Sequence, residues 1–267
     1  MLKYPDIDPI AIDFGVIKIH WYGISYVVGI LLAWWLLHWR SKTVYRDWSS
    51  VQVSDLIFYT TVGIILGGRL GSVLFYNLPY YLNHPLDIFK IWNGGMSFHG
   101  GLIGVCIALW LFGRLRHKGF FTVTDFMVPV VPVGLFCGRI ANFINGELWG
   151  RPTDVPWAMV FPRADNQPRH PSQLYEAFLE GIVLFTILWL FSRKPKPAMA
   201  VSGMFLIFYG LFRGALEWVR QPDQYPGFLA GGWLTMGMLL SFPMFLAGIV
   251  LLVLAYRKNH PAAGIGE

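Results

Sequence analysis

Apolar stretches of about 20 residues recur along the whole chain, and this feature limits the possible folds more than any other. A transmembrane helix needs about that many predominantly apolar residues to cross the hydrocarbon core of a bilayer. The 267 residues are 55% hydrophobic and 13% charged, whereas a soluble domain carries roughly twice that charged fraction. The sequence therefore predicts an all-α polytopic membrane protein.

Seven transmembrane helices are expected. They cover Ile17–Leu37, Leu56–Tyr76, Met96–Phe112, Phe126–Ile144, Leu174–Phe191, Val201–Trp218 and Leu234–Tyr256. Pro129 and Pro132 are expected to kink or break the fourth helix, because proline removes a backbone hydrogen bond and clashes with the preceding turn. Glycines four residues apart, such as Gly63/Gly67/Gly71 and Gly100/Gly104, favour close packing of helices in membranes.

The distribution of Lys and Arg predicts the orientation. Eleven of these residues follow spans one, three, five and seven: Arg40, Lys42, Arg46, Arg114, Arg116, Lys118, Arg193, Lys194, Lys196, Arg257 and Lys258. The loops on the other side are longer and hold only seven. Because cytoplasmic loops are enriched in Lys and Arg, we expect the N-terminus outside and the C-terminus in the cytoplasm.

The composition argues against several classes of site. The net charge of +6 follows membrane topology rather than a nucleic-acid surface, so no nucleic-acid partner is expected. Cys106 and Cys137 both lie in apolar stretches without a C-x-x-C motif or a histidine at ligand spacing. Neither a metal site, nor a disulfide framework, nor a cofactor is predicted.

Three arginines lie inside predicted spans: Arg69, Arg139 and Arg213. An arginine near the bilayer centre costs about 2.5–3.5 kcal/mol on insertion scales, so each is a candidate functional residue. In the predicted topology all three lie in the outer halves of their spans. Arg139 and Asn142 are three residues apart and therefore share a helix face.

Other polar residues are expected at the same depth. Separate stretches supply Tyr22, His99, Asn142 and Glu217, and Arg220 shares the helix face of Arg213 and Glu217. Three arginines against one nearby carboxylate predict a cationic cavity for an anionic ligand. Because the planar guanidinium matches phosphate geometry, the expected ligand is a phospholipid headgroup.

Two outer segments are too long to be simple turns. Residues 77–95 are expected to form an arm and residues 146–171 a small head, both as insertions in a single integral-membrane catalytic domain spanning residues 1–267. Neither segment is long enough to build an independent hydrophobic core.

The longest distinctive motif in the chain is G-R-I-A-N-F-I-N-G-E-L-W-G-R at Gly138–Arg151. Others lie at His20–Gly23, Gly67–Asn77, Gly94–Gly101, His170–Glu176 and Phe208–Asp223. Together these motifs resemble those of the bacterial prolipoprotein diacylglyceryl transferase family. The resemblance covers nearly the whole chain in order, with Met238 at a position where glutamine is expected.

The resemblance implies a reaction and a place in the cell. Members transfer the diacylglyceryl group of phosphatidylglycerol to the lipobox cysteine of a prolipoprotein, which forms a thioether and releases glycerol phosphate. The expected localisation is the bacterial inner membrane, with the active site towards the periplasmic leaflet.

The expected catalytic residues are Arg139, Arg213 and His99. The arginines would bind the charge that develops on the leaving phosphate, and His99 would either accept the thiol proton or only hydrogen-bond the lipid. Substrate contacts are expected from Tyr22, Arg69, Asn142, Glu147, Gly150, Glu217 and Arg220. Arg69 fits a lipid contact or a bond between helices equally well, and Glu217 fits a structural ion pair or a catalytic role.

Two other functions fit the sequence less well. An intramembrane hydrolase is disfavoured because Ser97 and His99 are two residues apart and do not share a helix face. An anionic-phospholipid scramblase or transporter would need a charged path across the bilayer or inverted repeats. The inner halves of the predicted spans are largely apolar, and no repeat is visible.

Overall fold

The computed structural model describes residues 2–5, 7–15, 18–91, 94–222 and 227–257. Six helical stretches are long and apolar enough to cross a membrane. They are α1 (Trp21–Thr43), α2 (Ser50–Phe75), α4 (Phe98–Leu115), Phe120–Ile144, Ser172–Phe191 and α10 (Met236–Arg257). Helix α9 (Ala200–Leu216) is apolar but shorter, with 17 residues. The prediction of a polytopic helical membrane protein is confirmed.

Each of the seven expected spans overlaps one of these helical stretches. A total of seven spans and the orientation of the termini stay predictions. The first helix begins at Trp21, and Ile17, where its start was expected, lies outside the described residues. So do Lys258 of the basic C-terminal end and residues 92–93 of the arm.

Two of the long stretches are interrupted. Phe120–Ile144 consists of α5 (Phe120–Met127), the 3₁₀ helix η3 (Val128–Val130) and α6 (Val131–Ile144), so the expected break at Pro129 is confirmed. Ser172–Phe191 consists of α7 (Ser172–Glu176), the π-helix η4 (Ala177–Val183) and α8 (Leu184–Phe191). Wide π-turns inside α-helices occur frequently at functional sites.

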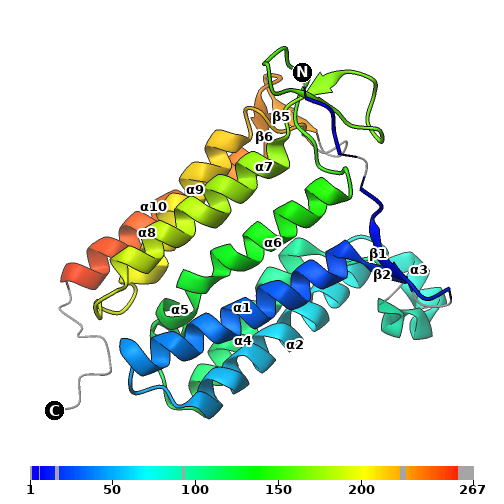
Figure 1. Ribbon diagram of the computed structural model, residues 1–267. Helices are drawn as coiled ribbons and strands as arrows, with labels where there is room; N and C mark the ends of the chain where they lie inside the picture. The colour runs from blue at the N-terminus through cyan, green and yellow to red at the C-terminus, as the bar shows by residue number, and fades with distance from the viewer. Residues whose placement is uncertain (1, 6, 16–17, 92–93, 223–226, 258–267) are drawn as a thin grey trace. The chain divides into compact units, whose positions relative to one another are not determined.

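The chain divides into two compact units. The first comprises Met1–Leu37 and Asp125–Glu267, and the second comprises His38–Thr124. In the first unit α8, α9 and α10 lie side by side, with α6 next to the helix that contains η4 (Figure 1). Buried Leu184, Leu188 and Val201 form its apolar core.

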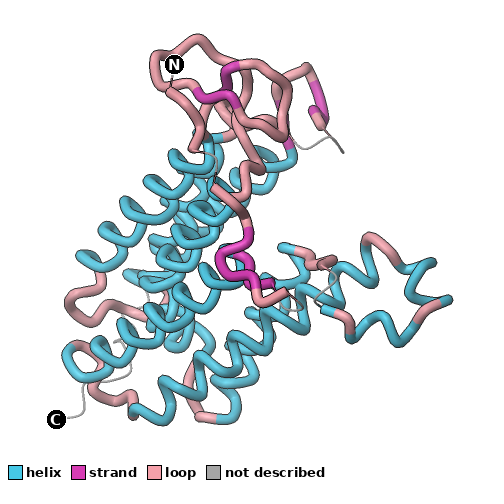
Figure 2. Tube along the Cα trace, turned by 45° about the vertical axis from the view of Figure 1, so that its right-hand side comes forward, coloured by secondary structure: helices cyan, strands magenta, loops and turns pink. Residues whose placement is uncertain are grey.

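Loops and short strands cover one end of the first unit (Figure 2). Strands β3 (Met159–Val160) and β4 (Pro168–Arg169) pair antiparallel within the head. Strand β1 (Ile10–Asp13) pairs with β2 (Lys18–His20), and β5 (Phe228–Ala230) pairs with β6 (Leu234–Thr235). Isolated bridges join Leu2 with Met159, Gly150 with Arg220 and Pro152 with Arg169. Tyr4 packs against Phe161 and donates its hydroxyl proton to the carbonyl of Phe143 at 2.5 Å. The N-terminal segment thus completes a small core that the head cannot form alone.

The second unit is built on the antiparallel helices α2 and α4. A Cβ on Gly67 would lie 2.8 Å from the Cα of Gly104, and one on Gly63 would lie 2.9 Å from the Cβ of Ala108. Since real Cβ atoms do not approach other atoms so closely, the expected glycine packing is confirmed here. Helices α3 (Leu78–Asn83) and η1 (Pro85–Phe89) extend from the end of α2 and form the arm.

We expect Gly104→Ala to lower the free energy of unfolding by about 1–3 kcal/mol, because the added methyl group overpacks the contact between α2 and α4. Gly101→Ala is the matched control, since its Cβ would meet only the carbonyl oxygen of Ile64, at 3.7 Å. Denaturant titration of the purified protein in detergent measures both variants. Equal stability of the two variants would contradict this packing.

Candidate functional site

Three arginines of the first unit surround one buried carboxylate. Arg139 of α6 places Nε 2.6 Å from Glu176 Oε2. Arg213 of α9 places Nη1 3.8 Å from Glu176 Oε1, and Arg220, after the end of α9, places Nη1 3.6 Å from the same oxygen. Glu176 has no exposed surface. The structure therefore brings together Arg139 and Arg213, two of the three arginines that the sequence predicted to converge, and adds Arg220.

Two further carboxylates complete the cluster. Glu180 Oε2 lies 3.4 Å from Arg139 Nη2. Glu217 forms an ion pair with Arg213 and accepts a hydrogen bond of 2.5 Å from the Thr235 hydroxyl. Glu180 and Glu217 are both buried, so the arginines meet their counter-charges out of contact with water.

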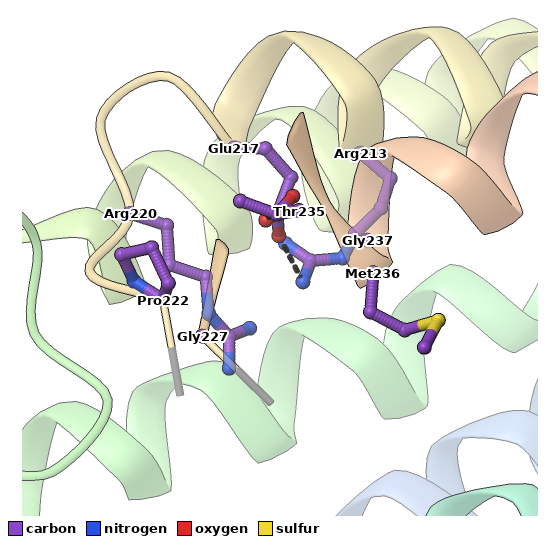
Figure 3. Close-up of a pocket in the computed structure, with 8 residues that line it drawn as sticks. All are labelled: Arg213, Glu217, Arg220, Pro222, Gly227, Thr235, Met236 and Gly237. Carbon is purple, nitrogen blue, oxygen red and sulfur yellow. Dashed lines mark hydrogen bonds and ion pairs between the residues drawn. The ribbon is translucent and has the colours of Figure 1, made fainter. Parts of the chain in front are cut away.

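A cavity of about 40 Å³ opens beside this cluster. Figure 3 shows Arg213 and Arg220 reaching it from α9 and from the segment after α9, with Glu217 and Thr235 above the Arg213 guanidinium. Arg213 Nη1 is buried and forms no hydrogen bond with any described residue. Its ion-pair partner Glu176 Oε1, at 3.8 Å, lies beyond hydrogen-bond distance, so this nitrogen has unused hydrogen-bonding capacity.

The expected excess of positive charge at the site is corrected by the structure. The sequence argument set three arginines against one carboxylate, but Glu176, Glu180 and Glu217 formally balance Arg139, Arg213 and Arg220. Arg69 belongs to the second unit. Any attraction for an anion therefore depends on directed hydrogen-bond donors rather than on net charge.

Asn142 and Glu147 are held together at the end of α6. Asn142 Nδ2 donates to Glu147 Oε1 at 2.9 Å, and Asn145 Nδ2 donates to the same oxygen at 3.3 Å. Gln173 Nε2 donates to the backbone carbonyl of Glu147 at 2.6 Å. These bonds tie the end of α6 to α7, the helix that carries Glu176.

Gly150 lies where three backbone segments meet. Its amide donates to the carbonyl of His170 at 2.8 Å, and the amide of Arg151 donates to the carbonyl of Val219 at 2.8 Å. A Cβ on Gly150 would lie 2.6 Å from the Val219 carbonyl oxygen and 2.6 Å from the His170 Cβ. Gly150 therefore has a packing role, and its direct contact with substrate stays a prediction.

Two arginines of the head hold the three backbone segments at Gly150 together. Arg151 donates to the carbonyls of Glu217 and Arg220, both at 3.0 Å. Arg169 donates to the carbonyl of Gly150 at 3.0 Å and bonds both carboxylate oxygens of Asp165, at 2.6 and 2.7 Å. The hydrogen bonds from Arg169 hold the pKa of Asp165 below its usual range.

The other expected site residues are placed as follows. Tyr22, in the first turn of α1, has its hydroxyl 3.2 Å from that of Tyr26. Met238 donates its amide to the Thr235 hydroxyl oxygen at 3.3 Å. His99 is exposed on the first turn of α4 in the second unit. A contact of Tyr22 or His99 with substrate stays a prediction.

Arg69 has a structural task within the second unit. Its guanidinium donates to five backbone carbonyls at 2.5–3.2 Å, those of Asp87, Ile88, Lys90, Gly94 and Gly95. The Arg69 side chain therefore attaches the arm to α2 through these hydrogen bonds. A role of Arg69 in lipid binding stays a prediction.

Ser97 is engaged in capping α4. Its hydroxyl oxygen accepts a hydrogen bond of 3.1 Å from the amide of Gly100, and the residue is 5% exposed. This N-cap interaction occupies the serine that a hydrolase would need as nucleophile. Among the described residues, no group of three or more His, Cys, Asp or Glu side chains could hold a metal ion.

Sequence reasoning missed Glu176, Glu180, Arg151 and Thr235. The two glutamates carried a usable signal, because both lie inside a predicted span and are four residues apart, on one helix face. The roles of Arg151 and Thr235 depend on chain crossings that the sequence does not reveal.

The fold and the site define a multi-pass helical membrane protein with a buried cluster of arginines and glutamates at one end of its helices. The family model described as prolipoprotein diacylglyceryl transferase matches residues 9–254. The phosphatidylglycerol–prolipoprotein diacylglyceryl transferase of Pseudomonas paraeruginosa is 57% identical over 259 residues, which is 97% of each chain. The transferases of the same name from Pseudomonas fluorescens and Oleidesulfovibrio alaskensis are also 57% identical, over 98% of each chain.

The chain belongs to the prolipoprotein diacylglyceryl transferase family. The resemblance noted in the sequence is thereby confirmed. The motif around Arg139 supplies the end of α6, and the motif that ends at Glu176 supplies α7, so the two most distinctive motifs meet in one cluster.

We expect Arg69→Lys to raise the amide hydrogen-exchange rate of residues 77–91 by about tenfold or more, because one ammonium cannot replace five guanidinium bonds and each 1.4 kcal/mol corresponds to a factor of ten. Arg114→Lys is the control, since Arg114 lies exposed at the far end of α4, over the ring of Trp110. Unchanged exchange in the arm of Arg69→Lys would show that other contacts hold it.

Proposed function

We propose that this protein transfers the diacylglyceryl group of phosphatidylglycerol to the lipobox cysteine of a prolipoprotein, with release of glycerol phosphate. Family membership supports the reaction. The observation that carries the assignment to this site is the Arg213 Nη1 atom, which is buried, lies 3.8 Å from Glu176 Oε1 and forms no hydrogen bond with any described residue. A phosphate oxygen is the acceptor that such a donor suits.

The chemistry requires stabilisation of a growing negative charge. The thiolate attacks the terminal glyceryl carbon, a carbon–sulfur bond forms, and the carbon–oxygen bond breaks with its electron pair left on the phosphate. The phosphodiester carries one negative charge and the leaving phosphate monoester carries two. Donors of Arg139 and Arg213 that bind the second charge more strongly than the first lower the barrier.

The thiol must lose its proton during the attack. Its ordinary pKa is about 8.5 and only the thiolate is a good nucleophile, so His99 is proposed as the general base that accepts this proton. Its exposure on the first turn of α4 leaves its ring accessible to a substrate. Tyr22, Asn142 and Glu147 are proposed to orient the substrate, and Glu217 and Arg220 to support Arg213.

The proposed placement is the bacterial inner membrane, with seven spans and the site towards the periplasmic leaflet. Helix α9, with 17 residues, is at the short end of the length that crosses a bilayer, about 17–25 residues. The excess of Lys and Arg in the loops after spans one, three, five and seven supports a cytoplasmic C-terminus. Arm and head then lie on the outer face, where phosphatidylglycerol and the exported cysteine meet.

The direct test is transfer by the purified protein in detergent, given only phosphatidylglycerol and a lipobox peptide, with the thioether product detected by mass spectrometry. We expect Arg139→Lys to lose most of the rate, because a point charge does not reproduce the planar fork of donors. Removal of one stabilising donor costs about 100-fold or more in turnover. Arg163→Lys, in an exposed part of the head, should keep the wild-type rate. An Arg139→Lys enzyme with wild-type activity would remove Arg139 from the phosphate.

The role of His99 is tested by the pH dependence of single-turnover rates. His99→Ala should lose more turnover than lipid affinity, since a base acts in the transition state. Raising the pH towards about 8.5, the ordinary thiol pKa, should recover part of its rate relative to wild type because more thiolate is present. His99→Gln should behave like the alanine variant. A glutamine variant close to wild type, with a parallel pH profile, would show that His99 only holds the headgroup.

A further inference from the structure

Glu176 contacts all three arginines of the cluster, which neither of the other two glutamates does. It lies 2.6 Å from Arg139, 3.8 Å from Arg213 and 3.6 Å from Arg220. Glu180 contacts Arg139, and Glu217 contacts Arg213. Arg139 comes from α6, whereas Arg213 and Arg220 come from α9 and the turn that follows it, so Glu176 is the point at which their positions are tied together.

The bonding of Glu176 differs from that of an ordinary buried carboxylate. The residue has no exposed surface, and both of its oxygens contact guanidinium nitrogens. Neither oxygen accepts a well-aligned hydrogen bond from any described residue. Buried polar groups are normally hydrogen-bonded, so the ion-pair contacts with the three arginines are the interactions that hold Glu176.

We infer that Glu176 is a positioning residue, which fixes the three guanidinium groups so that their remaining donors converge on one phosphate. This inference rests on the proposed function. Glu176 itself does not contact the substrate in this assignment. It acts through Arg139, Arg213 and Arg220, whose mutual repulsion in a medium of low dielectric constant would otherwise drive them apart.

The place of Glu176 in the chain supports this role. It is the last residue of α7, where the helix widens into the π-helix η4. Gln173, one turn earlier on α7, is fully buried and bonds the backbone of Glu147. The backbone that carries Glu176 is thus anchored to the end of α6, so the carboxylate offers the arginines a fixed point.

The charge balance predicts which kinetic constant depends on Glu176. Loss of its charge leaves three arginines with two glutamates, and the added positive charge favours any bound phosphodiester. The guanidinium groups then no longer hold the geometry that stabilises the transition state. We therefore expect KM for phosphatidylglycerol to stay within about threefold of wild type or to fall, while kcat drops about 100-fold, the loss typical of a displacement of about 1 Å.

The experiment compares Glu176→Gln, Glu176→Asp and Glu180→Gln in the peptide transfer assay, with phosphatidylglycerol varied in mixed micelles. Glu176→Asp keeps the charge on a shorter side chain and should retain at least ten times the kcat of Glu176→Gln. Glu180→Gln should lose less kcat than Glu176→Gln, because Glu180 contacts one arginine rather than three. If Glu176→Gln does not fold, the same comparison of kcat with KM is made on Glu176→Asp, whose shorter reach should lower kcat about tenfold or more.

Asp125→Asn is the matched control for loss of a buried carboxylate. Asp125 lies outside the arginine cluster and accepts hydrogen bonds from the amide and hydroxyl of Ser202, at 2.8 and 2.5 Å. This variant should melt at a lower temperature and keep the kcat of wild type. A Glu176→Gln enzyme with the same behaviour would overturn the positioning role.

Two other results have distinct meanings. A Glu176→Gln enzyme with unchanged kcat and a tenfold higher KM would overturn the inference by making Glu176 a binding residue. Absence of transfer by the wild-type protein itself, when it is folded and supplied with lipid and peptide, would instead refute the proposed function.

Discussion

The ion pairs around Glu176 are the interaction on which the rest of the site depends. A charge buried without a partner is far more costly than a buried pair, because it gives up water and receives nothing in return. Arg139, Arg213 and Arg220 are tolerable inside an apolar helical protein because Glu176, Glu180 and Glu217 neutralise them. The same contacts connect α6, α7 and α9, so the ion pairs that form the site also hold these helices of the first unit together.

The backbone departs from regular helix close to this cluster. The 3₁₀ turn η3 precedes α6, and the π-helix η4 follows Glu176. On the other side, Gly150 permits three backbone segments to cross, and Arg151 binds the carbonyls after α9. Glu176 and Glu180 are four residues apart at this π-helix, and both form ion pairs with Arg139.

Much of this arrangement is visible in the sequence, because charge in an apolar segment is conspicuous. The helices and the roles of Arg139 and Arg213 as cluster members could be predicted from that contrast alone. Glu176 and Glu180 are equally conspicuous by the same criterion. Counting their charges removes the excess of positive charge that the arginines alone suggest. Arg69 shows the limit of such reasoning. Its five carbonyl partners belong to the fold of the arm, and no local sequence pattern indicates that fold.

A charge-balanced cluster is compatible with phosphate chemistry. A fixed negative charge opposes the doubly charged transition state more than the singly charged substrate, so the glutamates do not lower the barrier through their charge. Orientation has a different effect, since donors that already point at the developing charge need no reorganisation when it appears. Arg213 Nη1, buried and without a hydrogen-bond acceptor among the described residues, is the donor to which the proposed function gives this part. In that proposal the carboxylates lower phosphate affinity but fix the geometry of the arginines, whose charges they also balance when no lipid is bound.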